Sequence, residues 1–116
     1  AQEPLHDLSK AYKHFEIATD FKDNQQYDSA IFYYKLISMT FRNAANWNQY
    51  VKVKGNLAYC YLQLQRLTEC EANLAEASEV NLQNTEIPES TIAFIYDQYG
   101  RFFHEKGAVQ IIMRNY

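Results

Sequence analysis

Three segments of the chain share one spacing of small and large residues, and this repeat limits the fold more than any other feature of the sequence. The segments are IATDFKDNQQYDSAIFYYKLI (17–37), LAYCYLQLQRLTECEANLAEA (57–77) and YGRFFHEKGAVQIIMRNY (99–116). Each has a small residue, an aromatic residue three positions later, and matching positions six beyond the aromatic and twelve and sixteen beyond the small residue. The matching columns are Ala18, Phe21, Tyr27, Ala30 and Tyr34; Ala58, Tyr61, Leu67, Cys70 and Leu74; and Gly100, Phe103, Val109, Ile112 and Tyr116.

The spacing within each half of the repeat indicates helices. Intervals of three and four residues place side chains on one face of a helix, whereas the side chains of a strand alternate every second residue. Polar stretches at 22–26, 63–66 and 105–107 separate the halves and suit short turns between antiparallel helices. Small residues that face each other let the two helices of a hairpin approach closely. The repeat therefore predicts a series of helical hairpins.

This pattern resembles the tetratricopeptide repeat, whose consensus has a small residue on the first helix, an aromatic residue three later, and a small and an aromatic residue on the second helix. Asn56-Leu57-Ala58 stands where that family has Trp-Leu-Gly. Ala18 to Ala58 spans 40 residues and Ala58 to Gly100 spans 42, against the family's usual period of about 34. The resemblance is therefore to long-period arrays, such as those of kinesin light chains and of bacterial signalling and CHAT-associated proteins.

The resemblance implies an all-α fold, a right-handed superhelical array of antiparallel helix pairs with about two and a half to three hairpins. We expect a single domain over 1–116, with hairpins at about 5–43, 46–81 and 88–116. Because such an array would end within a helix at Tyr116, without a polar cap, we expect the chain to be a fragment of a longer protein. The six expected helices lie at about 5–23, 27–43, 46–64, 67–81, 88–106 and 108–116.

Charge and hydropathy argue against two classes of partner. The formal net charge is −3, and Lys and Arg are scattered without the basic stripe that nucleic-acid binding requires. No apolar run approaches the roughly 20 residues that span a bilayer. We therefore expect neither a nucleic-acid partner nor a membrane span. The cytoplasm is the favoured compartment, while Ala1 as the first residue also agrees with export and removal of a signal peptide.

Cys60 and Cys70 lie in the same expected hairpin and allow two interpretations. A disulfide would need the two thiols to face each other, but Ala58 is the residue opposite Cys70, and two residues along a helix turn Cys60 away by about 200°. A metal site would need nearby partners with CxxC or HxxxH spacing, which His6, His14 and His104 do not provide. We therefore interpret both cysteines as small hydrophobic residues, and we expect no metal and no cofactor.

The sequence offers no recognisable catalytic site. Gly55, Gly100 and Gly107 do not form a phosphate-binding loop, and no Ser or Cys nucleophile stands in a strand-turn-helix context. Acidic pairs such as Glu69 with Glu71 fall on one expected helix and are typical of a solvated face. We therefore expect a chain that is not an enzyme.

The family resemblance places function on the concave wall formed by the first helix of each hairpin. It implies a groove for a protein or peptide, in which tyrosines provide contact area and charged residues fix the register. Chaperone-binding members clamp a carboxylate with Lys and Asn, but the corresponding residues here are Phe15, Thr19, Gly55 and Tyr59, so chaperone tails are not the expected ligand. The implied groove residues are Tyr12, Phe15, Thr19, Lys22, Lys52, Gly55, Tyr59, Leu62, Gln63, Asp97, Arg101 and His104.

The sequence thus predicts a non-catalytic protein- or peptide-binding module, acting as a scaffold or sensor within a larger signalling protein. Two alternatives stay open. In the first alternative, the array is a structural spacer that self-associates through its end helices, with Ile112 and Tyr116 at the contact. In the second alternative, about half of the implied groove residues, such as Phe15, Lys52 and Arg101, only pack against neighbouring helices or lie in solvent.

Overall fold

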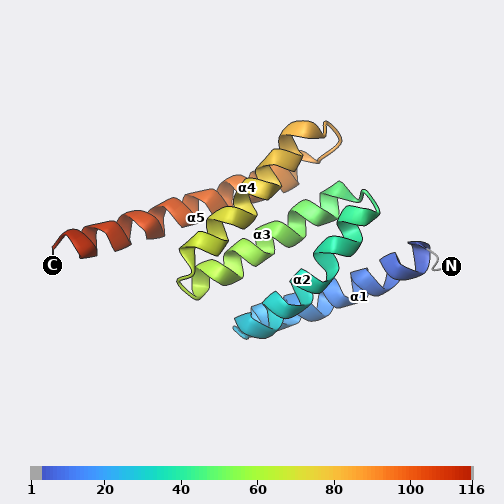
Figure 1. Ribbon diagram of the computed structural model, residues 1–116, viewed down its shortest axis with the longest axis horizontal. Helices are drawn as coiled ribbons and strands as arrows, with labels where there is room; N and C mark the ends of the chain where they lie inside the picture. Colours follow the sequence, from blue (N-terminus) through green and yellow to red (C-terminus); the bar gives the residue numbers. More distant parts are fainter. Residues whose placement is uncertain (1–3, 116) are drawn as a thin grey trace.

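The computed structural model describes residues 4–115, and its side chains from Leu8 onward (Figure 1). This part of the chain is entirely helical and has no strand, which confirms the predicted all-α class. The helices are α1 (Pro4–Asp23), α2 (Tyr27–Asn43), α3 (Trp47–Gln63), α4 (Leu67–Gln83) and α5 (Glu89–Arg114).

Consecutive helices pack side by side, so the helices follow one another across the molecule in chain order (Figure 1). In addition, α5 packs on α3 as well as on α4. The result is elongated, with extents of 58 × 32 × 21 Å, and the C-terminal part of α5 projects beyond the other helices (Figure 1). Helix α3 lies in the middle and has more than half of its residues buried.

The end of the chain differs from the prediction. A turn was expected near 105–107 between helices at 88–106 and 108–116, but α5 runs without a break from Glu89 to Arg114. A single glycine costs a helix only about 1 kcal/mol, and the neighbours of Gly107 are good helix formers. The predicted third hairpin is therefore wrong, and the described residues form two hairpins followed by one long helix. Tyr116 lies outside the described residues.

The seams of the first two hairpins are made by small buried residues. Ala18 and Ala30 are fully buried where α1 meets α2, and Ala58 and Cys70 are buried in the same way in the second hairpin. Tyr34 and Leu74, at the next matching column, are fully buried as well. The third copy of the pattern behaves differently, because its Gly100, Phe103 and Ile112 are exposed.

The first three linkers adopt the same turn, a Schellman motif at the end of a helix. They occupy 24–26, 44–46 and 64–66, and the middle residues Gln25, Ala45 and Gln65 have φ of 62°, 55° and 60°. In each linker the amide of the third residue donates to the carbonyl of an aromatic residue five positions earlier. The acceptors are Phe21 at 2.8 Å, Phe41 at 2.9 Å and Tyr61 at 2.8 Å. The structural repeat is therefore one helix plus one turn, half of the 40-residue period seen in the sequence.

Replacing Ala45 by glycine is expected to stabilise the protein. A left-handed conformation costs an L-residue about 1–2 kcal/mol, and glycine gives back about 0.5–1 kcal/mol in unfolded-chain entropy. Ala45→Gly should therefore raise the free energy of unfolding by about 0.5–1 kcal/mol in urea titrations. Ala44, with φ of −85°, is the matched control, and Ala44→Gly should lower that free energy. A loss of stability in both variants would contradict this account of the turn.

Candidate functional site

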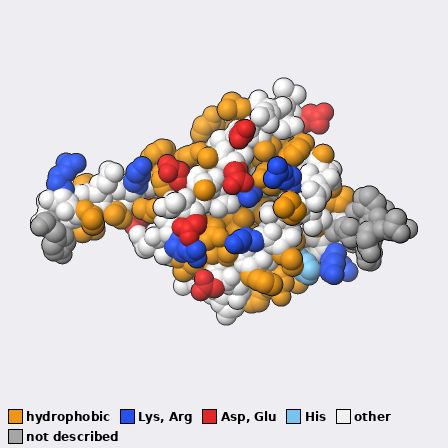
Figure 2. Space-filling view, in the orientation of Figure 1, with side chains coloured by type: hydrophobic (Ala, Val, Ile, Leu, Met, Phe, Trp, Pro, Cys, Tyr) orange, Lys and Arg blue, Asp and Glu red, His pale blue; other side chains and the backbone are white. Residues whose placement is uncertain are grey.

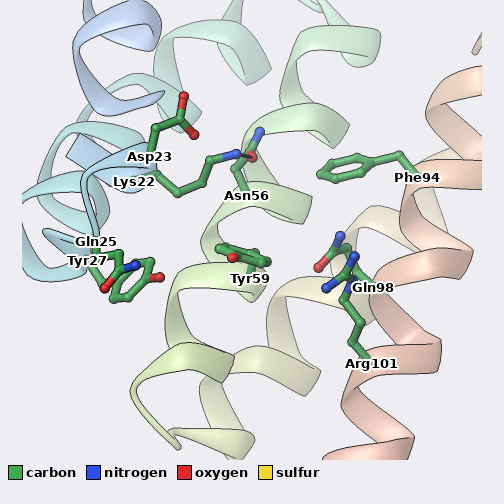
Figure 3. Close-up of a pocket in the computed structure, with 9 residues that line it drawn as sticks. All are labelled: Lys22, Asp23, Gln25, Tyr27, Asn56, Tyr59, Phe94, Gln98 and Arg101. Carbon is green, nitrogen blue, oxygen red and sulfur yellow. Dashed lines mark hydrogen bonds between the residues drawn. The ribbon is translucent and has the colours of Figure 1, made fainter. Parts of the chain in front are cut away.

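Two adjoining cavities form a groove over α3, and Arg101 lines both of them. Figure 3 shows the residues that line the first cavity. The first cavity, of about 510 Å³, is bounded by the end of α1, the start of α2, and α3 and α5. The second, of about 740 Å³, lies between the C-terminal end of α3 and the middle of α5. The first is lined by Lys22, Asp23, Gln25, Tyr27, Asn56, Tyr59, Phe94, Gln98 and Arg101, and the second by Leu62, Gln63, Gln65, Tyr96, Asp97, Gly100, Arg101, His104 and Glu105.

Most of the residues implied by the sequence come together in this groove. Lys22 and Tyr59 line the first cavity with Arg101. The second cavity is lined by the predicted residues Leu62, Gln63, Asp97 and His104, again with Arg101. Residues from α1, α3 and α5 therefore meet on one surface although the sequence separates them by 30 positions or more.

Three of the implied residues on α1 hold helices together instead of lining the groove. The Thr19 hydroxyl lies 2.8 Å from the hydroxyl of buried Tyr34, and the Phe15 ring meets the Tyr34 ring edge-on at 5.7 Å. The Tyr12 hydroxyl accepts a hydrogen bond of 2.9 Å from Asn46 in the turn before α3. These contacts agree with the packing interpretation of these positions.

The implied positions Lys52 and Gly55 on α3 also lie outside the lining of the groove. The carbonyl of Lys52 accepts a 2.9 Å hydrogen bond from Asn56 Nδ2, and Gly55 is buried. A Cβ at Gly55 would overlap the ring of Phe94 and the Cδ1 methyl group of Ile95, so glycine is what lets α5 approach α3 here. Gly55 therefore lies at the contact between α3 and α5 and does not face the groove.

Lys22 is held at the wall of the first cavity by contacts from α1 to α3. Its Nζ donates a 2.9 Å hydrogen bond to Asn56 Oδ1 and lies 5.5 Å from the centroid of the Tyr59 ring. Tyr27 packs edge-on against Tyr59, with ring centroids 6.2 Å apart. A cation over an aromatic face is stabilised by the ring quadrupole, so the ammonium is fixed while it still faces the cavity.

Among the groove residues that sequence reasoning missed, Gln98 is the most buried. The residue is 5% exposed, and among the described residues its Oε1 is buried without a hydrogen-bond partner. Figure 3 shows Gln98 and Arg101 on α5, across from Tyr59 on α3. A buried acceptor left unpaired costs about 1–3 kcal/mol, so such an atom needs an explanation. One sequence signal existed, because Gln98 and Asn56 both stand two positions before the small residue of their repeat.

Arg101 and Asp97 form a surface ion pair at the junction of the two cavities. Arg101 Nε donates to Asp97 Oδ2 at 3.2 Å, one helical turn apart on α5. Both side chains are more than half exposed, so the pair adds little to stability. The guanidinium therefore remains available to an anionic group in either cavity.

The cysteines lie in the core, away from the groove. Cys60 and Cys70 are buried and free, as expected of small hydrophobic residues. Burial raises the pKa of the Cys60 thiol to about 12 and that of the Cys70 thiol to about 11, so neither is a reactive thiolate near neutral pH. Within the described residues, no three His, Cys, Asp or Glu side chains gather in a way that could hold a metal ion.

These thiols predict a fall in stability at alkaline pH. A raised pKa in the folded state means that stability is complete below the ordinary thiol pKa of about 8.5 and declines as the pH rises towards the folded values. The free energy of unfolding in urea should thus be constant from about pH 6 to 8 and lower at pH 10. Cys70→Ala, which installs the residue found at the matching position 30, should reduce that decline. An unchanged decline would assign it to other groups, such as Tyr34, whose pKa burial also raises.

No known protein family, curated protein or solved structure matches this chain. In the part of the chain that the structure describes, no helix is both long and apolar enough to cross a membrane.

Proposed function

We propose that this chain is a non-catalytic protein- or peptide-binding module of tetratricopeptide type. Three features support the proposal: two hairpins with small residues at their seams, turns that repeat the same geometry, and a groove lined by α1, α3 and α5. A right-handed superhelical path of the hairpins and a place within a larger signalling or scaffold protein belong to the same proposal.

The unpaired Gln98 Oε1 is the observation that carries the proposal. A rotation of the Gln98 amide would turn this acceptor from its buried position towards the cavity that Gln98 lines, where an N–H or O–H donor of a ligand would satisfy it. Each unit of an extended peptide carries such a donor, and Tyr59 and Phe94 provide aromatic area beside it. Lys22 and Arg101 place two cations in the lining of the first cavity, where Asp23 is the one carboxylate; Asp97, the partner of Arg101, lines the second cavity. The preferred ligand is therefore a peptide with an acidic residue near the bound backbone.

Gln98→Met is expected to separate function from stability. Methionine keeps the approximate size of glutamine but removes the unpaired acceptor, so the free energy of unfolding should rise by about 1 kcal/mol. Peptides selected on the wild-type protein from a random displayed library should bind Gln98→Met at least about tenfold more weakly, a change of about 1.4 kcal/mol. Calorimetric titration with the selected peptides measures this loss.

Asn81 supplies a matched control. Its Oδ1 is also buried without a partner among the described residues, but Asn81 lies on α4 and does not line the groove. Asn81→Met should therefore leave peptide affinity unchanged. Equal peptide affinities for Gln98→Met and the wild type, or a library that yields no binding peptide, would contradict the proposed groove.

A second candidate function is a structural spacer that self-associates through the end of α5. It is favoured by the exposure of Ile111, Ile112 and Met113, which lie where α5 extends past the other helices. In this case Ile112→Glu would abolish a concentration-dependent increase in size, whereas substitutions in the groove would leave the increase unchanged.

A further inference from the structure

Helix α2 carries an exposed apolar stripe on the side away from the core. Phe32, Leu36 and Met39 are 62%, 52% and 58% exposed. Their spacing of four and three residues places them on one face of the helix. Hydrophobic side chains reach the surface in the lower part of Figure 2, where α2 begins. Single exposed apolar residues are ordinary, but a continuous stripe of large ones marks a contact surface.

The second hairpin shows that the fold does not require this stripe. Helix α4 is the counterpart of α2, 40 residues later, and packs against α3 as α2 packs against α1. At the positions matching Phe32, Leu36 and Met39 it has Ala72, Glu76 and Glu79, all exposed. The same place in the same kind of hairpin is thus filled by small or charged residues. The large apolar residues of α2 are therefore explained by a contact outside the hairpin.

We propose that this stripe binds α2 of a second copy of the chain in an antiparallel pair. A two-fold axis at Leu36 would bring each Leu36 against the other, and Phe32 of one copy against Met39 of the second. Such an isologous contact needs only one self-complementary surface. Helices pair at about 8–10 Å, close enough for these side chains to exclude water from one another.

The charges beside the stripe favour a second copy over a different protein. Asp28 and Arg42 lie in the first and last turns of α2, eight residues before and six residues after Leu36. At about 100° per residue they fall within about 40° of each other on the same flank. In the antiparallel pair Asp28 therefore lies near Arg42 of the second copy, and this ion pair forms twice. The antiparallel arrangement also sets the positive end of each helix dipole beside the negative end of the other.

Lys35 is the unfavourable element in this contact. It lies between Asp28 and Arg42 on the same flank, so the axis brings it towards Lys35 of the second copy. Removing its charge is therefore expected to tighten the pair, which a purely hydrophobic contact of unspecified geometry would not predict.

Sedimentation velocity of the whole chain over about 5 µM to 1 mM tests the proposal. The wild type should show a monomer–dimer equilibrium. Leu36→Glu should raise the dissociation constant by at least about tenfold, in keeping with a residue at the centre of a contact. The combined variant Phe32→Ala, Leu36→Glu and Met39→Glu copies α4 and should be a monomer with unchanged helical circular dichroism. Lys35→Gln should lower the dissociation constant.

A charge exchange keeps the test valid even if an apolar variant fails to fold. Asp28→Arg alone should weaken the dimer, and adding Arg42→Asp should restore it, because the two ion pairs re-form with reversed sign. A wild type that stays monomeric up to 1 mM would overturn the proposal. The same holds for a dimer that is lost in Ile112→Glu but kept in Leu36→Glu, and for a stripe that binds phosphatidylglycerol vesicles while the chain stays monomeric.

Discussion

The left-handed residue in each three-residue turn is the constraint on which the remaining structure depends. Gln25, Ala45 and Gln65 each reverse the chain after a helix, and the carbonyl of Phe21, Phe41 or Tyr61 accepts the bond that closes the turn. Because α2, α3 and α4 all have 17 residues, each helix completes the same rotation between the turns at its two ends. The linker before α5 has extended residues at Asn84 and Pro88 instead, and α5 rests on both α3 and α4. Residues of α5 consequently line both cavities of the groove over α3.

The sequence predicted the first two hairpins well because seam residues and turns agree there. The ends of α2, α3 and α4 fall within two residues of the expected bounds. The small residues at matching positions fixed which residues face each other across the seam, and the polar stretches between them marked where the helices end. The prediction of a third hairpin failed although Gly107 stands seven positions after the small residue, as Gln25 and Gln65 do, because the helix formers on either side of Gly107 continue α5 through it. Agreement of residue types at the matching positions of the repeat therefore does not by itself predict a turn. The 20-residue structural period stayed hidden because alternate helices bury different faces.

The groove could be predicted only in part. Positions on the first helix of each hairpin led to Lys22, Tyr59 and Arg101, because the repeat fixes which face of a helix turns away from the seam. Gln98 was missed because the one sequence signal for it, its match to Asn56, is not shared by the first copy of the repeat, which has the exposed Glu16 at that position. Whether the Gln98 oxygen has a partner depends on the positions of α3 and α5, which are set by the linker before α5 and by the close contact at Gly55.

The two proposed surfaces are independent, and this has a consequence for affinity. The groove is lined mainly by α1, α3 and α5, whereas the apolar stripe consists of Phe32, Leu36 and Met39 on α2, and the two sets share no residue. A pair joined through the stripe would therefore use none of the groove residues of either copy. Two grooves at a fixed separation bind a partner with two matching segments up to about 10²–10⁴-fold more tightly than one groove does, provided that the partner spans them. A groove of low peptide affinity and a dimer contact of low affinity would therefore together give tight binding of a partner with two segments, because pairing brings the two grooves together and the bound partner in turn stabilises the pair.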